Sequence, residues 1–193
     1  MKKLIVSLAV TLFMRTVSAQ TTWTIDKEHS SINFTVSHFV VGQTAGRFKD
    51  FDAKVLCKTD DFNGAVVSFT AKTASVDTDN DQRDHHLQSD DFLNAQKYPE
   101  MTFAGTLVNE AGKYFIKGSL TIRDITQTVV FAVTYNGRLK ESTFNVDKAG
   151  FTITGSLSRQ AYGLKWNETF EGGGAIVGDQ VNLNLNIEIN REK

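Results

Sequence analysis

The chain of 193 residues contains one cysteine and one proline. Because Cys57 has no partner in the chain, no internal disulfide can form and packing must hold the fold together. Charge of either sign is not in excess, with 21 basic and 22 acidic residues, which argues against binding nucleic acid by general attraction to phosphate. Phenylalanine and glycine are plentiful instead, with 14 of each. So much phenylalanine with so little proline indicates a large apolar interior and unbroken strands.

The first 19 residues have the features of a secretory signal peptide. Two lysines precede an apolar run over residues 4–14, and Val17-Ser18-Ala19 offers a small-residue cleavage site. The run is far shorter than the roughly 20 residues of a spanning helix, which disfavours an uncleaved anchor. We therefore expect cleavage near Ala19/Gln20, a single domain over residues 20–193, and a periplasmic or secreted protein.

Alternation of apolar and polar residues dominates the rest of the chain. Over residues 181–189 every second side chain is apolar, which is typical of a strand with one apolar face. Comparable patterns predict further strands at residues 32–36, 48–56, 65–73, 101–107, 114–120, 129–135 and 151–157. Asn63-Gly64, Ala111-Gly112 and Asn136-Gly137 predict turns between them.

About eight strands with one apolar face each require a common interior. Antiparallel closure buries these faces and removes free edges, so we predict an all-β, extended antiparallel β-barrel. Residues 80–95 have low strand propensity and predict a short helical segment that caps the barrel. An outer-membrane barrel is the alternative, but the polar residues 190–193 and the few tryptophans and tyrosines favour a soluble one.

Three polar residues are candidates for chemistry. His38 continues the apolar face of residues 32–36 and would point inward, either as a satisfied core group or as a polar handle for a ligand. Arg83 and His86 lie in the helical segment, where an arginine can tie loop carbonyls or a carboxylate. No recognised metal-ligand spacing or catalytic triad is visible, so we expect no metal site, no cofactor and no enzyme.

Many short segments resemble one family, the YceI-like proteins of the bacterial periplasm, which bind polyisoprenoid lipids. The resemblance covers essentially the whole mature chain, and residues 83–99 (RDHHLQSDDFLNAQKYP) are its most specific part. The matching segments are residues 23–26, 29–30, 36–38, 46–51, 75–78, 83–87, 89–93, 97–99, 118–122, Phe151 and 162–164.

The resemblance implies a lipocalin-like barrel whose apolar lumen holds an isoprenoid chain, such as a polyprenyl phosphate or a quinone tail. The candidate wall residues are Phe34, Val36, Phe69, Phe103, Ile116, Phe131, Phe151, Ile153, Leu183 and Leu185. The candidate head-group contacts are His38, Arg83 and His86. Small residues on the apolar faces would leave a tunnel among the phenylalanines; the alternative is that the rings fill it. These small residues are Gly105, Gly118, Gly155, Ala65 and Ala71.

The expected function is a non-catalytic carrier for an isoprenoid or similar long-chain lipid, which serves as its ligand. One alternative is an isomerase or dehydratase at the barrel mouth with His38 or His86 as general base. Another is an exported, stress-related binding module for a different amphiphile or for a protein. We expect no nucleic-acid partner; transient membrane contact and a homodimer are both left open.

Overall fold

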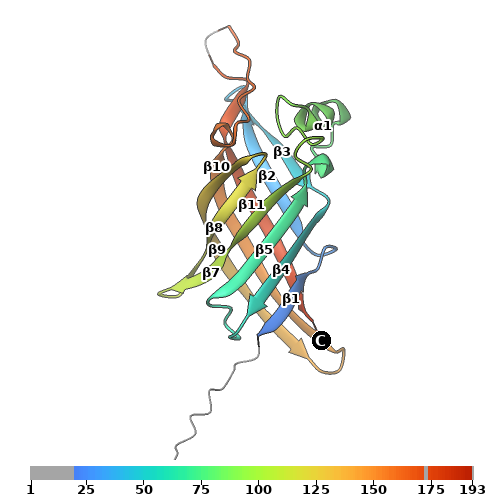
Figure 1. The fold of residues 1–193 in the computed structure, drawn as a ribbon, viewed down its shortest axis with the longest axis vertical. Helices are drawn as coiled ribbons and strands as arrows, with labels where there is room; N and C mark the ends of the chain where they lie inside the picture. The colour runs from blue at the N-terminus through green and yellow to red at the C-terminus, as the bar shows by residue number, and fades with distance from the viewer. Residues whose placement is uncertain (1–19, 172–173, 193) are drawn as a thin grey trace, which may run out of the picture.

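The described chain folds into one antiparallel sheet that closes on itself (Figure 1). The computed structural model describes residues 20–171 and 174–192, so the signal-peptide prediction lies outside the described residues. The strands are β1 (Thr21–Ile25), β2 (Ser31–His38), β3 (Gly42–Phe48), β4 (Phe51–Cys57), β5 (Ala65–Lys72), β6 (Val76–Asp77), β7 (Glu100–Glu110), β8 (Lys113–Ile122), β9 (Ile125–Glu141), β10 (Val146–Ser158) and β11 (Val177–Arg191).

Pairing of β1 with β11 closes a ring of eight strands. The ring runs β1-β4-β5-β7-β8-β9-β10-β11, while β2, β3 and β6 continue the sheet from β11. Strand β11 is long enough to pair with β1 near its C-terminus (Ile25 opposite Ile189) and with β2 nearer its start (Phe34 opposite Leu183). The prediction of an antiparallel barrel of about eight strands is therefore confirmed.

The irregular segments gather at one end of the barrel, which we call the helix end (Figure 1). Helix α1 (Asp81–Gln88) and the 3-10 turn η2 (Gln160–Tyr162) lie there, and the turn η1 (Thr73–Ser75) links β5 to β6. Both ends of the described chain lie toward the opposite end. Helix α1 is too short and polar to span a bilayer, and the described residues contain no other helix with the length and hydropathy of a membrane span.

Helix α1 forms where the sequence predicts a helical segment, and its first turn is fixed by side chains. The Asn80 side chain accepts a hydrogen bond from the backbone N–H of Arg83 at 2.9 Å, which is an N-cap. The Arg83 side chain donates from Nε to the Thr78 hydroxyl and from Nη2 to the Thr78 carbonyl, both at 2.7 Å. The interpretation of Arg83 as a residue that ties a loop carbonyl is confirmed.

Aromatic rings fill the end of the barrel opposite α1. Phe62 packs edge-on against Trp23 and Phe151, with ring centroids 5.0 and 5.2 Å apart. The guanidinium of Arg138 lies over the Trp23 ring, with its Cζ atom 5.0 Å from the ring centroid. It also forms a bidentate ion pair with the Asp147 carboxylate. Trp23 and Phe62 are fully buried, so the cluster forms part of the core at that end.

The predicted turn at Asn136-Gly137 is wrong. Both residues lie inside β9, which continues to Glu141. Gly137 pairs with Gly150 and Tyr135 pairs with Phe151, so Asn136 is an extra residue in a β-bulge. Gly137 has φ +119°, a conformation that glycine adopts readily, and it suits a bulge as well as a turn.

Candidate ligand-binding lumen

A cavity of about 260 Å³ runs inside the barrel. Among the residues that the structure describes, every side chain that lines it is apolar except that of Arg159. At about 30 Å³ for each water-sized group, this volume accommodates roughly nine such groups. A water molecule there would lack hydrogen-bond partners, so the cavity suits an apolar occupant.

The predicted wall residues all face this cavity. It is lined by Phe34, Val36, Phe69, Phe103, Ile116, Phe131, Phe151, Ile153, Leu183 and Leu185. They share one physical cause, because successive strand residues alternate between the two faces and the apolar face of each strand points inward. At the helix end, the lining is completed by side chains outside the barrel strands, namely Leu87, Phe92, Leu93 and Leu164.

Glycines keep the phenylalanine rings against the wall. A Cβ added to Gly155 would fall on the ring of Phe131, and one added to Gly105 or Gly118 would come within 2.5 or 2.7 Å of the Phe103 ring. Each ring therefore occupies the space that a side chain on its neighbour would fill. The lumen stays open because these rings lie along the sheet.

The predicted tunnel exists, but the small residues shape it differently from the prediction. The spaces above Gly105, Gly118 and Gly155 are filled by rings and are not part of the tunnel. Ala65 and Ala71 are fully buried in the core and do not line the cavity. The prediction that these two alanines border the tunnel is wrong, because their burial results from close packing within the wall.

An aromatic cluster lies at the helix end of the lumen. The His86 ring packs edge-on against Phe92 and Trp166, with centroids 5.0 and 4.8 Å apart. Its Nε2 lies 2.9 Å from the Asp91 carboxylate. Since Phe92 also lines the cavity, His86 is separated from the lumen by one side chain.

None of the three predicted head-group residues lines the lumen. His38 is exposed at the end of β2, with its ring edge-on to Phe39, and it does not reach the lumen. The apolar alternation of β2 ends at Val36, and His38 lies beyond the packed wall. Arg83 and His86 border a shallow surface depression together with Asn80 and Gln82.

Arg159 is a lumen residue that the sequence analysis missed. It is 4% exposed, and burial lowers the pKa of its guanidinium. The guanidinium donates to the carbonyls of Leu164, Trp166, Val177 and Gly178 at 2.6–3.1 Å, which ties the segment after η2 to the start of β11. The alternation through Ile153 and Leu157 does place position 159 on the inward face, so a signal was present.

One group in the described part of the chain has the composition of a metal site. Asp26, His29 and Glu188 bring three ligand-type atoms within 4.8 Å of one another. The ammonium of Lys148 already donates to Asp26 at 2.7 Å and to Glu188. This hydrogen bond holds the pKa of the Asp26 carboxyl well below its usual range, so a charged network accounts for the group.

Antiparallel strands closed around an apolar lumen define a small barrel of the lipocalin-like class, in which about eight strands enclose room for one ligand. Residues 23–189 match the YceI-like domain, and the chain belongs to this family.

Known relatives agree with this assignment in sequence and in fold. A UPF0312 protein of Staphylococcus aureus is 33% identical over 168 residues, which cover 87% of this chain and 96% of that protein. The structure of a Campylobacter jejuni YCEI protein is 30% identical, has a TM-score of 0.69, and covers 87% of this chain and 96% of its own. A polyisoprenoid binding domain from Saccharophagus degradans is similar in fold, with a TM-score of 0.65 at 13% identity over 88% of this chain and 98% of its own.

Proposed function

We propose that the protein is a non-catalytic carrier that holds one isoprenoid-type chain in its lumen. The observation that carries the proposal is a cavity lined by apolar side chains, with Arg159 the only polar one in the described part of the chain. A polar ligand entering it would lose its hydrogen bonds to water without replacement, at a cost of several kcal/mol for each group. An apolar chain would lose none.

The side chains that line the lumen indicate the chemistry of the lipid chain that it would hold. The wall combines flat aromatic rings with branched aliphatic side chains such as Ile153 and Leu185, which suit a slim, methyl-branched chain. The structural neighbour from Saccharophagus degradans is described as a polyisoprenoid binding domain, which supports the same ligand class for this chain. A polyprenyl phosphate or a quinone with an isoprenoid tail has the required chemistry.

The energetics favour carriage over irreversible capture. Burial from water is worth about 0.8 kcal/mol for each CH₂, so a long tail would exceed the roughly 18–21 kcal/mol ceiling of non-covalent binding. Such a lipid starts in a bilayer, however, whose interior is about as apolar as the lumen. Transfer of the tail is then nearly neutral in free energy, and the lipid can be released again.

The alternative of an enzyme at the barrel mouth has less support. Its candidate bases, His38 and His86, lie outside the lumen, and the Asp91 carboxylate engages His86. Among its described lining residues, the lumen presents no group placed to transfer a proton to a bound lipid chain.

Extraction of the purified protein with organic solvent, followed by mass spectrometry, tests the proposal. We expect one isoprenoid chain per barrel, either bound on purification or taken up from added lipid. Ile153→Trp, which fills the lumen with another apolar group, should lower the uptake at least tenfold. Thr154→Trp is the matched control, because Thr154 is exposed on the outer face of the same strand. Absence of lipid and of uptake in the native protein would refute the carrier function.

A further inference from the structure

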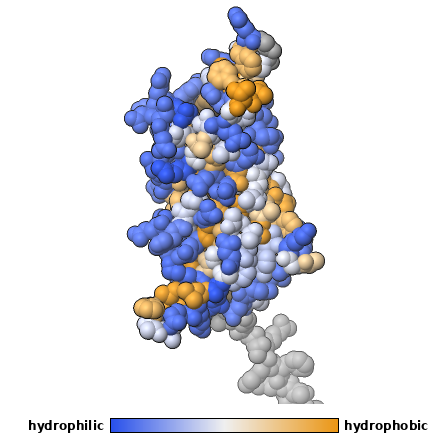
Figure 2. Space-filling view, turned by 180° about the vertical axis from the view of Figure 1, so that it is seen from behind, coloured by the Kyte–Doolittle hydropathy of each residue, from blue (hydrophilic) through white to orange (hydrophobic). Residues whose placement is uncertain are grey.

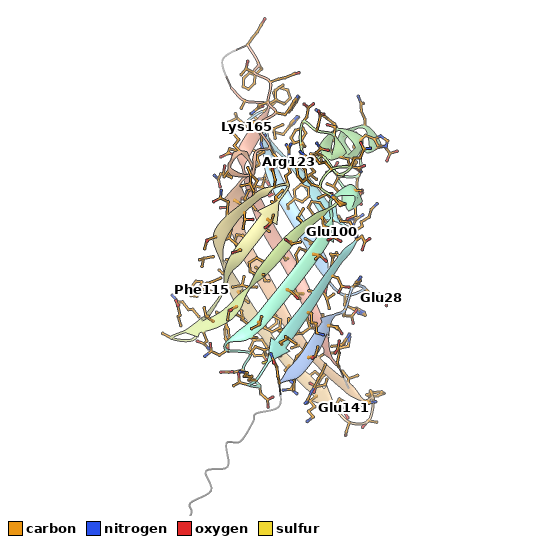
Figure 3. All side chains as sticks on the ribbon, in the orientation of Figure 1. Glu28, Glu100, Phe115, Arg123, Glu141 and Lys165 are labelled. Atoms are coloured by element: carbon orange, nitrogen blue, oxygen red, sulfur yellow. The ribbon has the colours of Figure 1, made fainter. Side chains whose placement is uncertain are left out.

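The hairpin between β2 and β3 ends in an exposed apolar tip made of Phe39, Val40 and Val41. Val40 and Val41 are 73% and 93% exposed, and Phe39 is partly exposed beside them. Apolar side chains gather at this end of the molecule in Figure 2. Exposed apolar groups in such a cluster mark a contact surface more often than isolated ones do.

The backbone of the tip is strained. Phe39 and Val40 have φ of 49° and 65°, in the left-handed region. His38 pairs with Gly42, so Phe39, Val40 and Val41 form a three-residue hairpin loop. Glycine and asparagine adopt positive φ readily, whereas a β-branched valine there is an outlier. Such strain is characteristic of functional positions, where a particular side chain is retained although the backbone conformation lowers the stability of the fold.

The tip is continuous with the wall of the lumen. Val36 and Val177 line the cavity, and His38, which pairs with Val177, is the last residue before the tip. The Phe39 N–H donates to the Ile176 carbonyl at 2.9 Å, and the Phe39 ring lies 5.7 Å from that of Phe170. A binding partner that contacts the tip would therefore lie against the helix end of the lumen.

The chemistry of the tip favours a lipid bilayer as that binding partner. Its three side chains can form no hydrogen bond, and they project from the barrel on a single hairpin. The charged residues of the neighbouring loop are Lys165, Glu168 and Glu171, with an acidic excess, so attraction to anionic lipid cannot provide the binding. Insertion of apolar side chains at the boundary of headgroups and acyl chains remains as the driving force.

We propose that Phe39, Val40 and Val41 insert into a membrane surface and hold the helix end of the lumen against it. This docking gives the proposed carrier a route for its lipid and in that sense rests on the proposed function. The contact itself does not require a lipid in the lumen.

Flotation of the purified full chain with phosphatidylcholine vesicles tests the docking. We expect the native protein to float with the vesicles, equally at low and at high salt. The variant Phe39→Asn/Val40→Gly/Val41→Ser should lose at least tenfold in vesicle binding. It should also remain folded with a higher unfolding midpoint, because asparagine and glycine adopt the positive φ of positions 39 and 40 with less strain than phenylalanine and valine. Loss of binding therefore cannot be attributed to misfolding.

A control comes from the opposite end of the barrel, where Phe144 is 78% exposed in the hairpin between β9 and β10. Phe144→Ser should leave vesicle binding unchanged. Equal loss in the tip and Phe144 variants would overturn the proposal, as would a native protein that does not float. Self-association abolished by the tip variant, without vesicle binding, would instead assign the tip to contact between copies.

Solvent extraction separates this proposal from the proposed function. Vesicle docking by a protein that neither contains nor takes up isoprenoid would refute the carrier function and leave the docking intact. Uptake of isoprenoid from detergent solution by a protein that does not bind vesicles would refute the docking and leave the carrier function intact.

Discussion

The contact between Gly155 and Phe131 gives a sharp prediction about how the lumen stays open. In Gly155→Ala, the new methyl group falls on the Phe131 ring, two of whose atoms lie 3.0 and 3.1 Å from the Cβ position and a third still closer. Overpacking of this kind costs about 1–3 kcal/mol. Alanine gains about 0.5–1 kcal/mol over glycine in a strand, so we expect a net loss of about 1–2 kcal/mol in the free energy of unfolding.

Urea unfolding in a double-mutant cycle with Phe131→Leu measures the contact. With the ring removed, Gly155→Ala should be neutral or slightly stabilising, which gives a coupling free energy of about 1–3 kcal/mol. Gly150→Ala is the matched control in the same strand, because its Cβ would meet no atom closer than 3.5 Å. It should be neutral or stabilising.

Two results would refute the reasoning. One is additivity of Gly155→Ala and Phe131→Leu, which would mean that the ring does not rest on the glycine. The other is equal behaviour of the Gly155 and Gly150 variants. Because the displaced ring has only the lumen to enter, Gly155→Ala should also lower isoprenoid uptake, which the extraction assay can follow.

Three further predictions concern the polar groups of the barrel. Arg138→Met should lower the free energy of unfolding by about 2 kcal/mol in urea titrations, since it removes the bidentate partner of the half-buried Asp147 carboxylate and leaves only the longer contact with Arg191 at 3.3 Å. Because Lys148 lowers the pKa of Asp26, stability from that pair is complete above about pH 4 and is lost as the pH falls below it. Lys148→Met should therefore flatten the loss of stability below pH 4, measured by urea unfolding at successive pH values; an unchanged slope would contradict the pairing. Arg159→Met should lower the free energy of unfolding by at least about 2 kcal/mol and speed hydrogen exchange in residues 164–167 and 176–178, which its hydrogen bonds to carbonyls hold together; unchanged exchange there would contradict that role.

The strands and the lumen wall could be predicted because period-two alternation assigns each residue to a face. Over β11, for example, Leu183 and Leu185 point inward wherever the strand is placed in the barrel. Strand β3 was not predicted separately, because its sequence GQTAGRF has no apolar alternation and gains its place by pairing with β2. The bulge at Asn136 was missed for the same reason, since its turn-like sequence becomes a bulge only when β10 lies alongside.

The parts of the site that sequence reasoning missed depend on contacts between distant residues. Whether the phenylalanines fill or line the barrel is decided by which glycine each ring faces, as with Phe131 and Gly155 on adjacent strands. The exposure of His38 depends on where the wall of the lumen ends, which alternation alone does not show. Arg159 required knowledge of the loop whose carbonyls surround it.

A crystal structure of the protein saturated with an isoprenoid lipid tests most directly whether the apolar interior is a binding site. We expect continuous density for one chain along the barrel axis between Phe34 and Ile153, with the ring of Phe131 still resting on Gly155. An interior closed by rotated phenylalanine rings, with the lipid absent or bound only on the outside, would contradict the account.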